Sequence, residues 1–182
     1  VMLTQEQLKR YHSDGFVVAE SVLSEREIVE LRSRAEKTIA LGIETAKHLS
    51  EEEKSNFDRS ELAAPPRAIA QGFLQDLAHR HERFWLLSRS SKILDLVEPI
   101  VGSDISMYLS RCVFKRRRDK NAVVAWHQDM AYWKGVPDKV IVAVALDRCT
   151  RESGGLCAIR ATHRPVAVER NLKTPEVRSR GL

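Results

Sequence analysis

Apolar side chains in the first hundred residues recur at helical spacing. Polar capping residues mark where the predicted helices begin, and glycines mark where they end. Thr4-Gln5-Glu6-Gln7 has the form of a capping box, and Ser13-Asp14-Gly15 is expected to end the helix that it opens. Ser24-Glu25-Arg26-Glu27 is a second capping box. It opens a longer helix, with Gly42 as the expected stop, whose apolar stripe is Ile28, Leu31, Ala35 and Ile39. Residues 91–101 predict a further helix, and the pattern across 46–83 is weak.

From residue 103 onward the apolar period changes from helical to alternating. Ile105, Met107, Leu109 and Val113 share one parity as far as Lys115. Further strands are predicted at 123–129, 139–146 and 156–159, and a short buried one at 16–19. Helices first and strands afterwards indicate an α+β chain with an antiparallel β core.

Size and composition narrow the class of protein. The chain has 182 residues, of which 43% are hydrophobic and 30% charged, as expected for one soluble globular domain. No apolar run is long enough to span a bilayer. Three cysteines without a C-x-x-C motif favour a reducing, cytoplasmic setting, in which they serve as small buried side chains.

The charge balance is basic, with a net charge of +5 and a pI near 9.3. Much of it lies in Lys115-Arg116-Arg117-Arg118-Asp119-Lys120. Such a run suits nucleic acid or an acidic small substrate. A solvated loop between two strands is favoured, because no aromatic residues interleave the run for base stacking. Nucleic acid is therefore an unlikely partner.

The strongest chemical signal is His127-Gln128-Asp129. Side chains two apart on a strand leave the same face, so His127 and Asp129 are expected to project together. They form two thirds of the 2-His-1-carboxylate set that holds Fe(II) and leaves other positions open. An H-x-D motif is common by chance, so the neighbouring sequence decides whether this one indicates a metal site. His79 and His81 are also two apart, but in a helical stretch they would not share a face.

Four blocks in order resemble the phytanoyl-CoA dioxygenase-like family. Residues 3–18, with Leu3-Thr4, Glu6-Gln7-Leu8 and Asp14-Gly15-Phe16-Val17-Val18, are similar to its opening. Trp126-His127-Gln128-Asp129 with Tyr132-Trp133 looks like its metal-binding strand, a block similar to that of its ectoine hydroxylases. Residues 142–154 resemble the next strand and turn, and 156–163 the strand that ends in Gly-Ser-His. The resemblance is weakest across 43–100.

This resemblance implies a fold and an activity. The expected fold is one domain over 1–182, with N-terminal helices (about 1–102) packed on a double-stranded β-helix of the jelly-roll, cupin-like type (about 103–165 onward). The expected activity is that of a non-haem Fe(II)- and 2-oxoglutarate-dependent dioxygenase. It would use O₂ to hydroxylate a small molecule and release succinate and CO₂; the basic residues suit an anionic substrate.

The resemblance also assigns residue roles. His127 and Asp129 would be the catalytic metal ligands, and the carboxylate of Asp129 favours hydroxylation over halogenation. Lys115 shares the inward parity of its strand and matches a family lysine near the cosubstrate, although a surface role is equally open. Tyr132 and Trp133 would line a substrate pocket or pack. His163 replaces a family histidine that is not a ligand.

The chain departs from the family at its end. The family's third ligand, a histidine, and the arginine that pairs with 2-oxoglutarate come later, and residues 164–182 contain no histidine. The chain is therefore expected to be incomplete at its C-terminal strands. The alternatives are a truncated or catalytically inactive member that acts as a binding module, and a basic nucleic-acid-binding protein. Substrate and oligomeric state are left open by the sequence.

Overall fold

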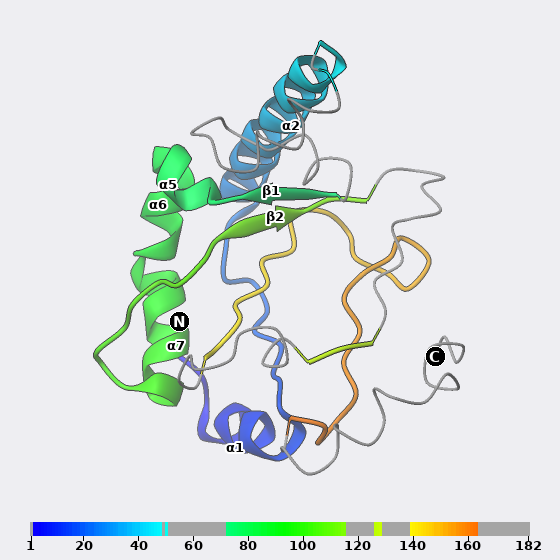
Figure 1. Ribbon diagram of the computed structural model, residues 1–182. Coiled ribbons are helices and arrows are strands. Elements are labelled where there is room, and N and C mark those ends of the chain that lie inside the picture. Colours follow the sequence, from blue (N-terminus) through cyan, green and yellow to red (C-terminus); the bar gives the residue numbers. More distant parts are fainter. Residues whose placement is uncertain (1, 49, 51–71, 116–125, 129–138, 164–182) are drawn as a thin grey trace.

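The structure is a computed structural model that describes residues 2–48, 50, 72–115, 126–128 and 139–163. Its elements are α1 (Gln5–Asp14), α2 (Glu25–Lys47), β1 (Phe73–Gln75), α5 (Leu77–Arg80), α6 (Glu82–Ser88), α7 (Ser91–Val101) and β2 (Arg111–Val113). Figure 1 shows β1 and β2 across the middle, with α5 to α7 along one side and α1 and α2 at opposite ends. Among the described helices, none combines the length and hydrophobicity needed to cross a bilayer.

Helix α1 has the two ends that its sequence predicts. The Thr4 hydroxyl accepts a hydrogen bond from the Gln7 amide (3.1 Å), and the Gln7 side chain accepts one from the Thr4 amide (2.9 Å). At the other end Gly15 has a φ of 87°, and its N–H donates to the Tyr11 carbonyl. The predicted capping box and glycine stop of this helix are confirmed.

Helix α2 begins as predicted but does not end at Gly42. Ser24 and Glu27 form the reciprocal capping bonds, yet the helix continues to Lys47. Ile39 and Ile43 pack against the buried pair Leu74 and Leu77. A glycine inside a helix costs about 1 kcal/mol, whereas burying an isoleucine contributes about 1.5–3 kcal/mol. Packing therefore outweighs the helix-breaking tendency of Gly42, and the predicted stop was wrong.

A small antiparallel sheet forms the centre of the core. Leu74 of β1, in a segment with little sequence signal, lies opposite Cys112 of β2. Bonds from Phe114 N–H to Gly72 O (2.9 Å) and from Asp76 N–H to Ser110 O (2.7 Å) lengthen the pairing at both ends. Leu74 is fully buried, and its cluster comprises Leu77, Ile39, Ile43, Phe84, Cys112 and Phe114. The sheet thus joins α2 to α5 and α6.

The alternating parity predicted as far as Lys115 breaks at Ser110. Leu109 is half-buried, and so is Ser110, whose hydroxyl accepts a hydrogen bond from the Ala78 amide at the start of α5. Beyond this point Cys112 faces the core while Val113 is 54% exposed. The parity argument that pointed Lys115 inward was therefore wrong, and Lys115 is exposed.

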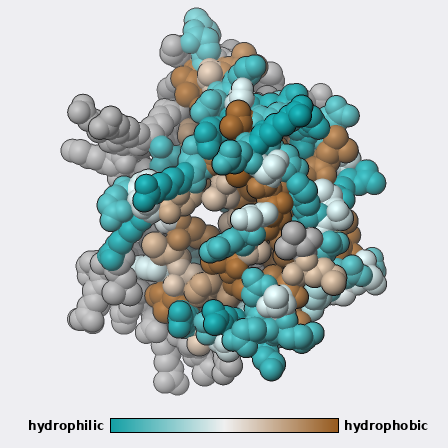
Figure 2. All heavy atoms as spheres, turned by 180° about the vertical axis from the view of Figure 1, so that it is seen from behind, coloured by the Kyte–Doolittle hydropathy of each residue, from teal (hydrophilic) through white to brown (hydrophobic). Residues whose placement is uncertain are grey.

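Other predicted strands are not regular strands. Residues 16–19 belong to no strand, and Val18 is 68% exposed, so the prediction of a buried strand was wrong. No strand is assigned in the described segments 126–128, 139–146 and 156–159; the rest of the predicted strand 123–129 lies outside the described residues. Ile141 is 61% and Leu156 85% exposed. The described residues therefore do not show the predicted β-helix. Figure 2 shows a hollow that is bordered in part by hydrophobic residues.

The three cysteines differ in exposure and should differ in reactivity. Cys149 and Cys157 are exposed, whereas Cys112 is half-buried, and burial, with a smaller effect of the Asp147 charge, raises the pKa of its thiol. Because the thiolate is the nucleophile, we expect maleimide to modify two thiols quickly and Cys112 slowly. Mass spectrometry of timed samples measures this. Equal rates in the native protein would contradict it, and urea should make the rates equal.

The first turn of α2 carries an acid-sensitive contact. Hydrogen bonds from Lys92 (2.7 Å) and then from Ser24 lower the pKa of Glu27 from 4.5 to about 2. Since the folded pKa lies below the unfolded one, this stabilisation is present above about pH 4.5 and is lost as the pH falls toward 2. Glu27→Gln should therefore lower the urea midpoint of unfolding near neutral pH, and lower it less near pH 3. The control Glu36→Gln, which changes an exposed glutamate of the same helix, should lower the midpoint less than Glu27→Gln does.

Candidate metal and cosubstrate site

His127 is the one member of the predicted metal pair that the structure describes. Trp126 and Gln128 are half-buried, and His127 between them is exposed. This alternation places His127 on the opposite face from its neighbours, as the sequence predicts for an extended segment. Asp129, Tyr132 and Trp133 lie outside the described residues.

The donor set fits a ferrous ion chemically. An imidazole and a carboxylate are ligands that Fe(II) accepts, and a two-residue spacing in an extended segment keeps both on one face. Among the described residues there is no group of three or more His, Cys, Asp or Glu side chains that could hold a metal ion. The described part of the chain therefore offers His127, to which the sequence adds Asp129.

His79 and His81 have structural surroundings instead. His79 lies in α5, and its ring is 6.1 Å from that of Trp85. His81 joins α5 to α6, and its Nε2 is 3.2 Å from the Thr38 hydroxyl of α2. Because that hydroxyl donates to the Arg34 carbonyl, it accepts from His81. His81 thus links α2 to α6.

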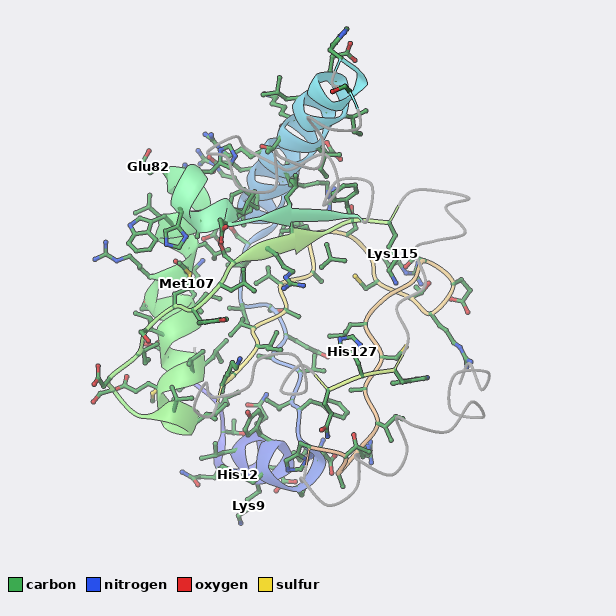
Figure 3. All side chains as sticks on the ribbon, viewed as in Figure 1. Lys9, His12, Glu82, Met107, Lys115 and His127 are labelled. Atoms are coloured by element: carbon green, nitrogen blue, oxygen red, sulfur yellow. The ribbon has the colours of Figure 1, made fainter. Side chains whose placement is uncertain are left out.

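Lys115 follows β2 and lies against the turn at residues 150–155. A Cβ atom placed on Gly154 would be 2.6 Å from Lys115 Cδ and 3.0 Å from its Nζ. The lysine chain therefore crosses Gly154, whose φ of 79° also favours glycine. Figure 3 shows Lys115 below the end of β2, on the side of the molecule where His127 lies. This contact was not predicted from the sequence, where Gly154-Gly155 is the only sign of it.

The predicted polar turn is present and is tied to α2. The Gly155 amide donates to the Thr150 carbonyl (2.8 Å), and the Thr150 amide to the Ser153 hydroxyl (2.8 Å). Arg32 of α2 forms an ion pair with Asp147 (2.9 Å) and donates to the Leu146 carbonyl (2.8 Å). The segment before the turn is thereby held against the helical part of the chain.

His163 contacts the end of α1. Its ring lies against Gly15 at the end of α1, where a Cβ atom would be 2.7 Å from His163 Cγ. Gln128 donates to the carbonyl of neighbouring Thr162. These contacts join the end of α1, the segment of His127 and the turn at 160–163, and the sequence pattern gave no sign of them.

Comparisons with known proteins point to one family. The family model described as Phytanoyl-CoA dioxygenase (PhyH) matches residues 11–180. A "Probable alpha-ketoglutarate-dependent hypophosphite dioxygenase" of Stutzerimonas stutzeri is 25% identical over 178 residues, covering 94% of this chain and 58% of the relative. An "L-proline trans-4-hydroxylase" of Streptomyces griseoviridis is 27% identical over 175 residues, covering 93% and 59%.

A third relative extends the same pattern. An "Ectoine dioxygenase" of Nocardia farcinica is 25% identical over 167 residues, covering 87% of this chain and 51% of the relative. The chain thus spans between half and three fifths of the length of these relatives. No solved structure matches significantly. Because the family match takes in nearly all of the sequence, the chain belongs to the phytanoyl-CoA dioxygenase (PhyH) family.

Proposed function

We propose that this chain carries the metal-binding part of a non-haem Fe(II)- and 2-oxoglutarate-dependent dioxygenase that hydroxylates a small molecule. The observation that carries the proposal is that the family match at residues 11–180 includes the His127-x-Asp129 pair. The three relatives, whose names denote dioxygenases or a hydroxylase, support it.

His127 and Asp129 are proposed to hold the ferrous ion. When bound, Fe(II) with 2-oxoglutarate and O₂ supplies the oxidation: one oxygen atom enters the substrate as hydroxyl, and the other enters succinate as CO₂ leaves. Asp129 keeps a carboxylate at the position where halogenating relatives have a small residue, so hydroxylation is the proposed outcome.

Lys115 is proposed to lie beside 2-oxoglutarate as a cosubstrate-binding residue. Its chain lies across Gly154 and ends on the side of the molecule where His127 lies (Figure 3). An ammonium group is a suitable partner, because a carboxylate taken out of water needs a charge or hydrogen-bond donors. Tyr132 and Trp133, directly after the ligand pair, are proposed to line the substrate pocket.

The proposed architecture is the double-stranded β-helix, with the helices on its outside. Residues 139–146 and 156–159 support it, because apolar side chains in them, such as Ile141, Val142 and Leu156, are exposed and need a partner layer. The whole chain is proposed to form one such domain. The basic run that starts at Lys115 favours an anionic substrate. Three free cysteines support a cytoplasmic location.

Succinate formation tests the proposed activity. The chain is incubated with Fe(II), 2-oxoglutarate and O₂, and succinate is quantified by mass spectrometry. We expect more succinate than from His127→Ala or Asp129→Ala proteins handled identically, because both variants lack a metal ligand. Equal amounts from all three would contradict the proposal and favour a family member that binds without catalysis.

A further inference from the structure

Three segments that are far apart in the sequence meet beside His127. They are the end of α1 at Asp14-Gly15, the segment Trp126–Gln128 and the turn at residues 160–163. The Ala161 amide donates to the Asp14 carbonyl (2.8 Å), and Arg160 lies 3.6 Å from the Asp14 carboxylate. Figure 1 shows the last described residues passing beside α1. We call this meeting point the α1 corner.

Gly15 allows the close approach on which the α1 corner depends. Its left-handed φ of 87° ends α1, and the ring of His163 occupies the space that any Cβ atom would need. A larger residue would therefore have to displace His163 as well as adopt an unfavourable backbone conformation. Gly15 thus serves the helix end and the contact with the turn at once.

The turn at 160–163 is held in a defined shape. Ala161 has a φ of 60°, a left-handed conformation that residues with a Cβ atom seldom adopt. The bond from its amide to Asp14 and the bond from the Thr162 hydroxyl to the Ile159 carbonyl (2.8 Å) support it. The Thr162 carbonyl is thereby presented to the side-chain amide of Gln128, which donates to it.

Gln128 lies between the two proposed metal ligands in the sequence. Trp126 and Gln128 are half-buried and His127 between them is exposed, so fixing Gln128 on one side fixes the direction of His127 on the other. We propose that the α1 corner is a positioning device for the proposed metal ligand His127, with Gln128 as the positioning residue and Gly15 and His163 as its support. This inference rests on the proposed function for its effect on metal binding.

Gln128→Leu tests the central contact, because leucine has similar bulk but no amide donor. Hydrogen exchange of the metal-free protein gives a readout that needs no metal. We expect faster exchange in peptides that contain 126–128, and Fe(II) affinity about 10–100-fold weaker, as changes behind metal ligands cause. The matched control is Gln5→Leu, which changes an exposed glutamine of α1. Unchanged exchange and affinity in Gln128→Leu would overturn the inference.

His163→Ala tests the support without touching Gln128. Removing the ring leaves Gly15 without its neighbour, so exchange should rise at Ala161 and also at 126–128. Both side chains act through the α1 corner, so their effects should not add. The double variant Gln128→Leu/His163→Ala should therefore show hydrogen exchange at 126–128 that is little faster than in Gln128→Leu alone. Faster exchange confined to 160–163 would overturn the positioning role.

The two claims fail in distinguishable ways. If the unaltered chain binds no Fe(II), the proposed function fails, while the exchange experiment still decides whether the α1 corner orders the segment of His127. If the unaltered chain binds Fe(II) and the Gln128→Leu protein binds it equally well, with unchanged exchange, the positioning role alone fails.

Discussion

Replacing His127 with alanine is expected to weaken Fe(II) binding by more than about 100-fold, and Asp129→Ala should have a similar effect. The reason is that each change removes a direct ligand, and changes to residues behind ligands already cost about 10–100-fold. Equilibrium dialysis under anaerobic conditions, with iron counted on both sides of the membrane, measures the dissociation constants.

Two exposed residues of the same types serve as controls. His48→Ala just after α2 and Asp104→Ala after α7 remove an exposed imidazole and an exposed carboxylate from parts of the chain outside the α1 corner. Both proteins should bind Fe(II) like the unaltered chain. An equal loss in all four variants would indicate nonspecific iron binding and would contradict the assignment of the pair.

Leu74→Ala is expected to lower the free energy of unfolding by about 2–5 kcal/mol, the range for large buried residues that leave a cavity. Leu74 is fully buried at the centre of the cluster that joins α2, the sheet and α6. Neighbours from several elements surround the site, so the structure cannot collapse easily into the space. Urea unfolding followed by circular dichroism measures the change.

Leu156→Ala is the matched control for this prediction. Leu156 is 85% exposed, so the same change of residue type should alter the free energy of unfolding by less than about 0.5 kcal/mol. If the two variants lost equal stability, the cluster around Leu74 would not be the core of this chain.

Local signals made the helices predictable. The ends of α1 follow from Thr4, Gln7 and Gly15, whose capping interactions need only neighbouring residues. Gly42 failed as a helix stop because its effect competes with a contact made far away, between Ile43 and the core around Leu74. The sequence shows the local preference but not the partner that overrides it.

The strands were harder for the same physical reason. Alternating apolar residues at 139–146 indicate a face that needs covering, but a strand exists only where another segment pairs with it. The parity of β2 was lost at Ser110 because its hydroxyl bonds to α5, a contact between distant segments. Short-range patterns carry no information on either partner.

The candidate site likewise has a part that local sequence predicts and a part that depends on distant contacts. The two-residue spacing of His127 and Asp129 is a local pattern, and the exposed ring of His127 agrees with it. The approach of Lys115 to Gly154 and of His163 to Gly15 depends on how distant segments pack. In the sequence, only the two glycines indicate these contacts. A glycine predicts a turn, but it does not show which side chain packs against it.

An anaerobic titration of the chain with Fe(II) and 2-oxoglutarate tests the central claim most directly. A keto acid chelated to ferrous iron gives a visible charge-transfer band, so its growth reports assembly of metal and cosubstrate on the protein. The account predicts a saturable band that is lost in His127→Ala and needs more 2-oxoglutarate in Lys115→Met. No band from folded protein, or a band that persists in His127→Ala, would contradict it.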